Sequence, residues 1–300
     1  MCADGTMQCD PELEPAFEII EPVRLQVPLV FNSPHSGTVY PQRFLAASRL
    51  DAFALRRTED TLADALFLHA TTLGAPLMRA RFPRSYLDVN REPYELDPRM
   101  FDGRLPGIAN TRSIRVAGGL GTIPRLVGEG QEIYSRRLPV EEAMARIEGI
   151  YKPYHRALHG LLMRARRHFG MCILVDCHSM PSAGRVGDTA VEADFVIGDR
   201  YGTSCAPGIA DTVCGELERL GYRVCRNKPY AGGFNTEHYG NPAGGTHAVQ
   251  IEVNRALYLN ERTLEPGSGF RQTQQALGTV VAALALHCVA ILAMGRLAAE

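Results

Sequence analysis

The fold of this chain is decided by one short stretch, Leu174-Val175-Asp176-Cys177-His178-Ser179. It continues an apolar run that begins at Cys172, and such a run is typical of a strand buried on both faces of a parallel sheet. Ligands bind at the carboxyl ends of strands of this kind. We therefore expect His178, which follows the apolar run, to lie in a functional site.

Three other segments show the same arrangement of an apolar run followed by polar residues. In chain order they are residues 29–31 before His35, Phe82 before Arg84 and residues 88–91, and residues 248–251 before Glu252. Polar residues at the ends of several strands are typical of a site assembled from distant parts of a chain. We expect these ends to meet around one metal ion.

The pattern of the chain alternates between strands and helices without an internal repeat, which predicts one three-layer α/β/α domain with a central mixed, mostly parallel sheet. We expect residues 1–20 to form a loose lead-in and residues 21–300 to form the domain. The expected strands are 27–32, 76–82, a central strand between Gly170 and Pro181, 195–198, 222–225 and 248–253. The expected helices run from the N-cap Asp51 to about Thr72, from Pro139 to about His168 with a kink at Pro153, from Pro207 to Leu220, and from the N-cap Ser268 to about Leu297.

Residues 92–131 are rich in Gly, Pro and Arg and have weak periodicity, so we expect a long loop that covers the active site. The run Gly118-Gly119-Leu120-Gly121 lacks the spacing of a phosphate-binding loop. No nucleotide site is predicted from it.

Composition favours a chain with a large core and a small partner. The chain has 300 residues, of which 45% are hydrophobic and 22% charged, and this is enough to bury a large core. A net charge of -1 and a pI near 6.8 provide no general attraction to nucleic acid or to anionic membranes. We expect a small molecule as the partner, and the sequence says nothing about the oligomeric state.

The cysteines and the two ends of the chain indicate a cytoplasmic protein. The eight cysteines are scattered and form no C-x-x-C pair, which favours reduced thiols. Residues 1–14 are polar and acidic and contain no apolar signal core. Residues 279–297 are the nearest to a membrane span, but His287, Cys288 and Gly295 interrupt them, and we expect a buried C-terminal helix.

His35 and His178 are candidate ligands of a metal ion. Catalytic zinc takes three protein ligands and leaves one position for water, so a carboxylate should join the two imidazoles. Glu59 and Asp60 are the candidates, and we favour Asp60 because Asp60 and Asp64 would share one helix face at a spacing of four. Each of these residues could instead have a purely structural role, since single histidines are often packing residues and acids often line an exposed helix face.

Glu252 closes an apolar strand, and an acid is costly to bury there without a partner or a purpose. Beside a metal-activated water, its carboxylate can accept the proton and later deliver it to a leaving amine. The alternative is a structural ion pair with Arg255.

Arg84, Asn90 and Arg91 are candidates for substrate binding. Guanidinium groups bind carboxylates through two hydrogen bonds and stabilise a developing oxyanion, which suits an acidic derivative of an amino acid. Surface arginines are common, so this triplet carries little weight alone.

Other nucleophiles are weaker candidates. Cys177 adjoins His178, but neighbouring residues on a strand face opposite sides, so the thiol and the imidazole should diverge. No serine lies in a G-x-S-x-G turn. His238 and His247 flank the last strand and could line the cleft or serve in packing.

Taken together, these residues resemble the N-formylglutamate amidohydrolase (formylglutamate deformylase) family. The matching segments are 32–37 (NSPHSG), 57–61 (RTEDT), 82–91 (FPRSYLDVNR), 151–155 (YKPYH), 176–180 (DCHSM) and 246–255 (THAVQIEVNR), and they lie within residues 25–262. The resemblance implies a phosphorylase/hydrolase-like fold related to zinc carboxypeptidases and aspartoacylase. It also implies hydrolysis of N-formyl-L-glutamate to formate and L-glutamate in histidine breakdown.

The resemblance also suggests roles for single residues. Asp88-x-Asn90-Arg91 looks like the clamp for the substrate carboxylate, His178-Ser179 like the later zinc ligand, and Glu252 like the general base. The wider group's first ligand pair is His-x-x-Glu, but Thr38 stands three residues after His35. The carboxylate ligand must therefore come from elsewhere.

The hypothesis from sequence is a zinc amidohydrolase with one Zn²⁺ per chain. His35, Asp60 and His178 would bind the metal, Glu252 would activate water, Arg84 would stabilise the oxyanion, and Arg84, Asn90 and Arg91 would bind the acidic N-acyl amino acid. The cation for a second substrate carboxylate could come from the loop 112–136. The alternatives are a deacylase for another N-acyl amino acid, a metal-free ligand-binding relative, and a cysteine hydrolase that uses Cys177.

Overall fold

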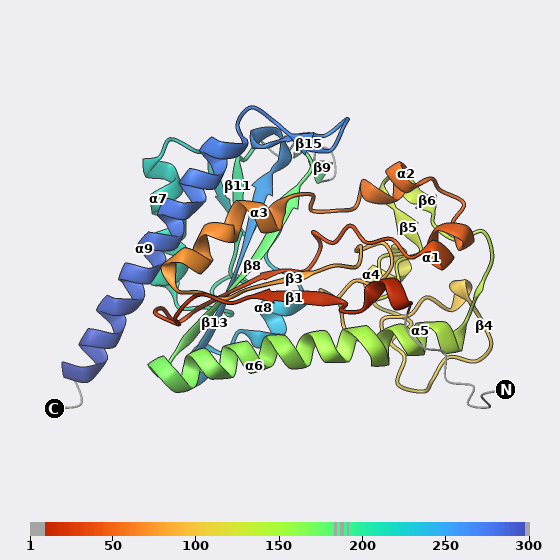
Figure 1. The fold of residues 1–300 in the computed structure, drawn as a ribbon, viewed down its shortest axis with the longest axis horizontal. Helices are drawn as coiled ribbons and strands as arrows, with labels where there is room; N and C mark the ends of the chain where they lie inside the picture. The colour runs from red at the N-terminus through yellow and green to blue at the C-terminus, as the bar shows by residue number, and fades with distance from the viewer. Residues whose placement is uncertain (1–9, 183–184, 187–188, 191, 298–300) are drawn as a thin grey trace. The chain divides into compact units, whose positions relative to one another are not determined.

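The computed structural model describes residues 10–182, 185–186, 189–190 and 192–297, and its main element is a seven-stranded sheet (Figure 1). The strand order is β1-β3-β2-β8-β13-β11-β12. The bounds are β1 Phe17–Ile20, β2 Leu29–Ser33, β3 Leu77–Ala80, β8 Cys172–Met180, β11 Phe195–Gly198, β12 Val224–Arg226 and β13 Thr246–Asn254. The pairs β2·β3, β2·β8, β8·β13 and β11·β12 are parallel, and β11·β13 is antiparallel. The predicted α/β fold with a mixed, mostly parallel sheet is confirmed.

The described residues form two compact units, each assembled from separate stretches of chain. The loop-rich unit comprises residues 10–18, Pro34–Glu59 and Ala80–Leu158. The sheet unit comprises Ile19–Ser33, residues 60–79 and the described residues from His159 onward. Residues 17–20, expected in a loose lead-in, form β1 at one edge of the sheet.

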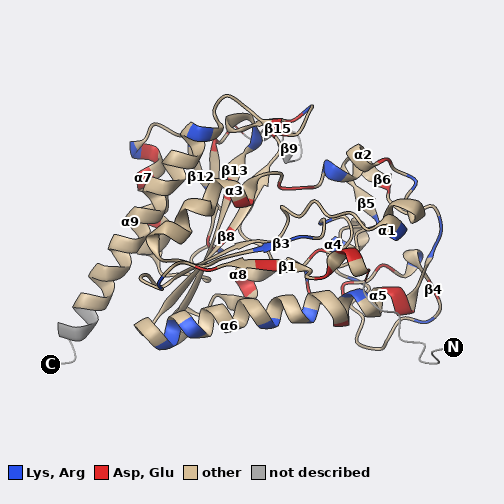
Figure 2. Ribbon diagram, viewed as in Figure 1, with Lys and Arg blue, Asp and Glu red and all other residues tan. Residues whose placement is uncertain are grey.

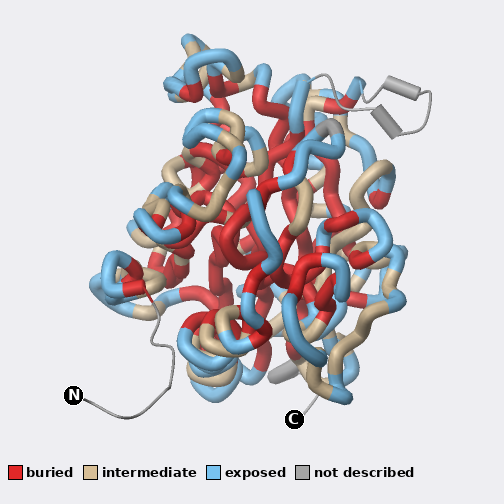
Figure 3. Tube along the Cα trace, turned by 90° about the vertical axis from the view of Figure 1, so that its right-hand side faces the viewer, coloured by how far each residue is buried: buried red, intermediate tan, exposed pale blue. Residues whose placement is uncertain are grey.

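The sheet unit has its apolar core on one face of the sheet. Side chains alternate between faces along a strand, so Ile173, Val175 and Cys177 of β8 lie on the same side and are all fully buried. They pack with three helices: α3 Ala63–Phe67, α7 Pro207–Arg219 and α9 Phe270–Leu297. In Figure 1, α7 and α9 lie side by side against the sheet. Figure 3 shows the buried backbone concentrated in the interior, as expected for strands covered in this way.

The expected helix from Asp51 to Thr72 is interrupted. Asp51 caps α2 (Ala52–Arg56) as predicted, because its side chain accepts a hydrogen bond from the amide of Ala54. The chain then leaves the helix, passes through Leu62 at φ 61°, and resumes as α3 and the 3₁₀ helix η2 (Leu68–Leu73). Asp60 therefore lies in a non-helical segment, and its predicted place on a shared helix face with Asp64 is wrong.

The long helix expected from Pro139 to His168 is continuous but irregular. It consists of α5 (Val140–Arg146), a π-helical turn η5 (Ile147–Tyr151) and α6 (Lys152–Phe169). The π turn ends just before Pro153, whose missing N–H removes one hydrogen bond from the helical ladder. The irregularity occurs where the kink was predicted.

The loop-rich unit consists of short elements, and Arg146 is buried among them. Its remaining elements are η1 Pro11–Leu13, α1 Gln42–Ala47, η3 Pro98–Met100, β4 Phe101–Asp102, α4 Ile114–Ala117, β5 Leu126–Val127, η4 Gly128–Gly130, β6 Gln131–Glu132 and β7 Leu138–Pro139. Residues 92–131, expected as one long loop, thus carry short helical turns, strand β4, which pairs with β7, and strand β5, which pairs with β6. Arg146 is 1% exposed, lies over the ring of Tyr86, and donates to the Tyr134 hydroxyl at 2.8 Å.

The sheet unit has several smaller elements at the ends of its strands. They are β9 Arg185–Val186, β10 Thr189–Ala190, α8 Phe234–Tyr239, η6 Pro242–Gly244, η7 Arg255–Leu257, β14 Leu259–Asn260 and β15 Glu265–Pro266. α8 contacts β8 and β13 and carries Asn235 to the side of the sheet opposite the apolar core. This second face of the sheet carries several of the candidate functional residues, which are described below.

The C-terminal helix α9 is long and almost free of charge, as Figure 2 shows. Within the described part of the chain, Phe270–Ala293 is the one helical stretch long and apolar enough to cross a membrane, and 33% of its most apolar window is buried. The helix packs against α3, η2 and α7, while Leu286 and Val289 are exposed. It begins at Phe270, two residues beyond the predicted N-cap Ser268.

Candidate metal centre

The second face of the sheet carries a row of buried polar side chains. Asp176 and His178 are two residues apart on β8, so both point to the face opposite Cys177. On β13, Gln250 and Glu252 are their partners in the parallel register. Each of these four residues is less than 10% exposed. The strand β8 continues to Met180, so His178 lies within the strand and not after its end.

His178 is held between two carboxylates. Its Nε2 lies 2.8 Å from Asp176 Oδ2, and its Nδ1 lies 3.0 Å from Asp60 Oδ2. Burial alone lowers the pKa of His178, but the two carboxylates outweigh burial and raise that pKa well above its ordinary value. An imidazole protonated on Nε2 would place its Nδ1 lone pair opposite the Asp60 oxygen, and two acceptors so close require a proton or a metal ion between them.

Asp176 is fixed by amide groups on its other oxygen. Asp176 Oδ1 accepts hydrogen bonds from Asn32 Nδ2 at 2.7 Å and from Asn235 Nδ2 at 3.2 Å. Asn32 is the register partner of Asp176 on β2, and Asn235 comes from α8. Because Asp176 is fully buried and its Oδ1 is engaged, Oδ2 is directed to the imidazole of His178.

Asp60, and not Glu59, faces His178. The second oxygen of Asp60, Oδ1, accepts from Ser179 Oγ at 3.1 Å and from Arg255 Nη2 at 3.3 Å. Glu59 instead accepts from the Tyr40 hydroxyl at 2.6 Å. The geometry thus favours Asp60, although the helical spacing that led to it is absent.

Asp64, the other acid of that predicted helix face, is turned elsewhere. It forms an ion pair with Arg79 of β3, with 2.8 Å between Arg79 Nη1 and Asp64 Oδ2. This residue is therefore engaged in a structural contact within the sheet unit.

His35 is held in the same manner as His178. Its Nε2 lies 2.8 Å from Asp88 Oδ1, and it is 1% exposed. Burial raises the pKa of Asp88, but the charges of Arg84 and Arg91 outweigh burial and hold that pKa well below its ordinary value. Asp88 is therefore an anion, as required to orient an imidazole through its N–H.

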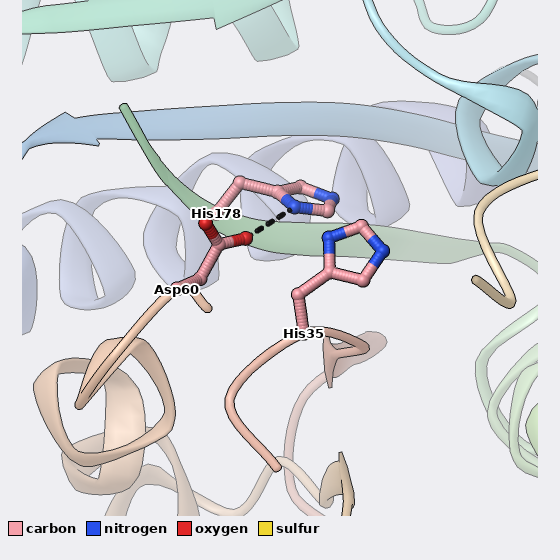
Figure 4. A group of neighbouring side chains, drawn as sticks. All are labelled: His35, Asp60 and His178. Atoms are coloured by element: carbon pink, nitrogen blue, oxygen red, sulfur yellow. Dashed lines mark hydrogen bonds and ion pairs between the residues drawn. The ribbon is translucent and has the colours of Figure 1, made fainter. Parts of the chain in front are cut away.

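The candidate ligands His35, Asp60 and His178 form one group (Figure 4). One donor atom of each lies within 4.8 Å of the others, and all three residues are buried. Donor atoms around a tetrahedral zinc ion are separated by roughly 3.3 Å. Two imidazoles and a carboxylate are a donor set that could bind a metal ion, and the assignment of these three residues as its ligands stays a prediction.

Arg84, Asn90 and Arg91 gather around Asp88. Arg84 Nε donates to Asp88 Oδ2 at 2.9 Å, and the backbone N–H of Asn90 donates to Asp88 Oδ1 at 2.8 Å. Arg91 Nη2 lies 3.6 Å from Asp88 Oδ2. Burial lowers the pKa of Arg91 to about 10. The same carboxylate therefore organises both a candidate ligand and the predicted substrate-binding residues, whose roles stay predictions.

Glu252 lies beside His178 on the neighbouring strand. Gln250 Nε2 donates to Glu252 Oε1 at 2.8 Å, which fixes one oxygen of the carboxylate. Arg255, expected as its alternative partner, donates to Ser179 Oγ at 3.1 Å and contacts Asp60. The role of Glu252 as a base stays a prediction.

Asp176, Asn32, Asn235 and Gln250 received no role from the sequence. The signal for Asp176 was its spacing from His178, because residues two apart on a strand share a face. Nothing local distinguishes Asn32 or Asn235, since each reaches Asp176 only through the pairing of distant segments.

The other candidate nucleophile lies outside this polar row. Cys177 is fully buried in the apolar core, and burial raises the pKa of its thiol well above the ordinary value. His247 accepts a hydrogen bond from the amide of Ala206 at 3.3 Å, and His238 stacks on Phe234. These contacts are structural.

The chain is similar to several known proteins over most of its length. Residues 27–259 match the family model described as N-formylglutamate amidohydrolase. The chain is 32% identical to N-formylglutamate deformylase of Pseudomonas aeruginosa over 82% of this chain and 87% of the relative, and 30% identical to that of Pseudomonas putida over 79% and 83%. The crystal structure of N-formylglutamate amidohydrolase from Ralstonia eutropha matches with a TM-score of 0.85 and 36% identity, covering 91% of this chain and 98% of that one.

Proposed function

The chain belongs to the N-formylglutamate amidohydrolase family and is a hydrolase that acts on an amide, and from that premise we propose that it hydrolyses N-formyl-L-glutamate to formate and L-glutamate with one bound zinc ion. The observation that carries this proposal is the buried group of His35, Asp60 and His178, with 3.0 Å between His178 Nδ1 and Asp60 Oδ2. Two imidazoles and one carboxylate are the donor set of many catalytic zinc sites.

Two buried aspartates would prepare the imidazoles for the metal. Asp176 would accept a hydrogen bond from Nε2–H of His178, and Asp88 would accept one from Nε2–H of His35, which leaves Nδ1 of each ring to bind the ion. A zinc ion bound here supplies a Lewis acid that polarises the formyl carbonyl and makes water a stronger acid. The protein's own residues supply the proton transfers and the binding of substrate.

Glu252 is the proposed general base. Its carboxylate accepts a proton from the attacking water, and the resulting carboxylic acid delivers that proton to the nitrogen of the leaving L-glutamate. Gln250 holds Oε1 of this carboxylate at 2.8 Å, so Glu252 Oε2 is the oxygen assigned to the transfer. The base is thereby oriented before substrate arrives.

Arg84, Asn90 and Arg91 are the proposed substrate-binding residues. The Arg84 guanidinium would stabilise the oxyanion that develops on the formyl oxygen, while Asn90 and Arg91 would bind the α-carboxylate. Their support is their common attachment to Asp88, which also holds His35 at 2.8 Å.

Chelation and metal add-back test this function directly. Treatment with dipicolinate followed by dialysis should abolish the release of formate from N-formyl-L-glutamate, and zinc added at one equivalent should restore it. Formate is measured with a coupled formate dehydrogenase, and metal content by mass spectrometry. Full activity in metal-free protein would contradict the proposal. Binding of N-formyl-L-glutamate with no formate release even after zinc is added would indicate a ligand-binding relative.

A substrate panel separates the proposed reaction from that of another deacylase. N-formyl-L-glutamate, N-acetyl-L-glutamate, N-formyl-L-aspartate and N-formyl-L-methionine share the α-carboxylate that the proposed clamp would bind, and they differ in the acyl group or the side chain. The highest kcat/KM is expected for N-formyl-L-glutamate. A higher value for any other member would assign the protein to that substrate.

A further inference from the structure

The loop-rich unit contains a basic cavity that the proposed function does not use. The cavity has a volume of about 240 Å³, and the charged residues that line it are Arg49, Arg99, Arg125, Glu132, Arg136 and Arg137. We propose that this cavity, the arginine pocket, is a second binding site, which takes a small multivalent oxyanion such as a phosphate or a polycarboxylate. In Figure 2, basic segments of the ribbon lie near α1 and β6, the elements that flank the pocket.

The main chain fixes the places of the lining arginines. The amide of Arg49 donates to the carbonyl of Ile133 at 2.8 Å, and the amide of Ile133 donates to the carbonyl of Arg125 at 2.9 Å. Strands β5 and β6 continue this pairing, with Leu126 opposite Glu132. Segments far apart in sequence are thus joined by hydrogen bonds, so the guanidinium groups are brought together by the fold.

Two carboxylates hold three of the arginines. Asp97, which is 2% exposed, accepts from Arg99 Nε at 2.8 Å and from Arg125 Nε at 2.9 Å. Burial raises the pKa of Asp97, but the hydrogen bonds from Arg99 and Arg125 outweigh burial and lower that pKa below its ordinary value. Glu132 lies 3.2 Å from both Arg49 and Arg125.

The pocket keeps an excess of positive charge. Among the side chains that the structure describes, five arginines face the two carboxylates of Asp97 and Glu132, which leaves three positive charges. Arg136 and Arg137 are exposed, and neither forms an ion pair with the described residues. Like charges held close together repel, and an anion with two or more charges would relieve this repulsion.

The chemistry of the pocket selects the class of ligand. A guanidinium group is planar and binds two oxygens of a phosphate or carboxylate at once, which a monovalent halide cannot match. The volume of about 240 Å³ admits an anion of several heavy atoms. The net charge of the chain is -1, so the chain as a whole provides no general attraction to polyanions.

Calorimetric titration with two probes tests the proposal. Inorganic phosphate represents phosphates, and benzene-1,3,5-tricarboxylate represents polycarboxylates, since its carboxylates are too far apart to chelate one metal ion. The titrations use full-length protein, with sodium chloride balancing the ionic strength. We expect saturable binding of one equivalent of at least one probe, and the tighter probe identifies the source of the oxyanion.

A pair of charge-matched variants locates the bound anion. R49Q/R137Q removes two positive charges from the pocket and should raise the Kd at least about tenfold. R166Q/R167Q removes two exposed charges from α6 and should leave the Kd unchanged. The melting temperature of each variant without anion, compared with the wild type, reports whether it is folded.

Three results would overturn the second site. They are no binding of either probe by the wild type, equal binding by R49Q/R137Q, and equal loss in both variants. Measurements of formate release distinguish a separate anion site from a part of the substrate site. A raised KM for N-formyl-L-glutamate in R49Q/R137Q would place these arginines at the substrate's carboxylate and would also overturn the second site. The proposal of an anion site can be tested separately from the proposed zinc-dependent function, since binding of the probes can be measured on metal-free protein.

Discussion

Glu252 and His178 are paired in register on the adjacent parallel strands β13 and β8. Their side chains therefore share a face of the sheet, and the charge of Glu252 is one of the causes that raise the pKa of His178. The proposed base and a candidate metal ligand are thus fixed side by side by backbone pairing, which requires no movement of a loop.

If Glu252 is the base, its substitution should reduce turnover without reducing zinc binding. Glu252→Gln keeps the shape and the hydrogen bond to Gln250 but removes the proton acceptor, so kcat should fall by at least about 10²-fold while zinc content stays at one equivalent. The measurements are formate release and metal analysis, with the exposed Glu265→Gln as control. Retained activity in Glu252→Gln would remove Glu252 from the role of base.

The support of His178 by Asp176 predicts an effect on metal affinity. Asp176→Asn retains the size of the side chain but loses the negative charge that orients the imidazole, so zinc affinity should fall by about 10- to 100-fold. Competition with a fluorescent chelator measures this affinity. The control is Asp194→Asn, which alters a carboxylate bound to Arg223 elsewhere in the sheet unit. An unchanged zinc affinity would refute this role for Asp176.

Substitutions of the neighbouring acids Asp60 and Glu59 should have different effects on zinc content. Asp60→Asn should lose stoichiometric zinc, because a neutral amide is a poor ligand beside two imidazoles. Glu59→Gln should keep zinc, since Glu59 bonds to Tyr40 and Arg56, and should instead lower the free energy of unfolding by about 1–3 kcal/mol. The reverse pattern of zinc content would identify Glu59 as the ligand.

The buried thiol predicts insensitivity to alkylation. Cys177→Ala should retain kcat/KM within about twofold, and iodoacetamide should not inactivate the wild type, because Cys177 lies in the apolar core with a raised pKa. Exposed Cys225 serves as the positive control for alkylation in peptide mapping. Inactivation that tracks modification of Cys177 would support the cysteine hydrolase.

The buried carboxylate Asp199 predicts a loss of stability in acid. Burial raises the pKa of Asp199, but hydrogen bonds from Arg226 and Asn227 outweigh burial and lower that pKa. A lowered pKa contributes stability above the unfolded value of about 3.9, and this contribution disappears as pH falls through the folded value.

Asp199→Asn should therefore be less stable than the wild type at pH 7, and the difference in the free energy of unfolding should shrink as pH falls below about 4. Urea denaturation across this range measures the difference. A gap that stays constant with pH would show that the charge of Asp199 contributes no stability.

The sequence by itself determined the strands and the polar ends that they carry. Alternation with a period of two is local, so the Asp176-x-His178 and Gln250-x-Glu252 spacings fix which side chains share a face before any tertiary contact forms. For the same reason the sequence placed Cys177 on the opposite face. The apolar run before His178 specified a buried strand because its residues can be covered on both sides.

The tertiary structure alone decided which acid faces His178. The choice between Glu59 and Asp60 depends on an interruption of the helix around Leu62, and only the packed chain shows that Asp60 turns toward His178 while Glu59 turns to Tyr40. Helical spacing is a rule about neighbours in an intact helix, so it could not report on a segment that leaves the helix.

The same limit applies to the aspartates and the arginine pocket. Asp88 meets His35 across 53 positions of sequence through a side-chain hydrogen bond. Arg49 meets the segment 132–137 across more than 80 positions through backbone pairing, and no local pattern encodes either contact. Local periodicity thus determined the faces of the strands and the residues available for chemistry. Which of those residues meet was decided by long-range strand pairing and loop closure, because these depend on the free energy of the whole packed chain.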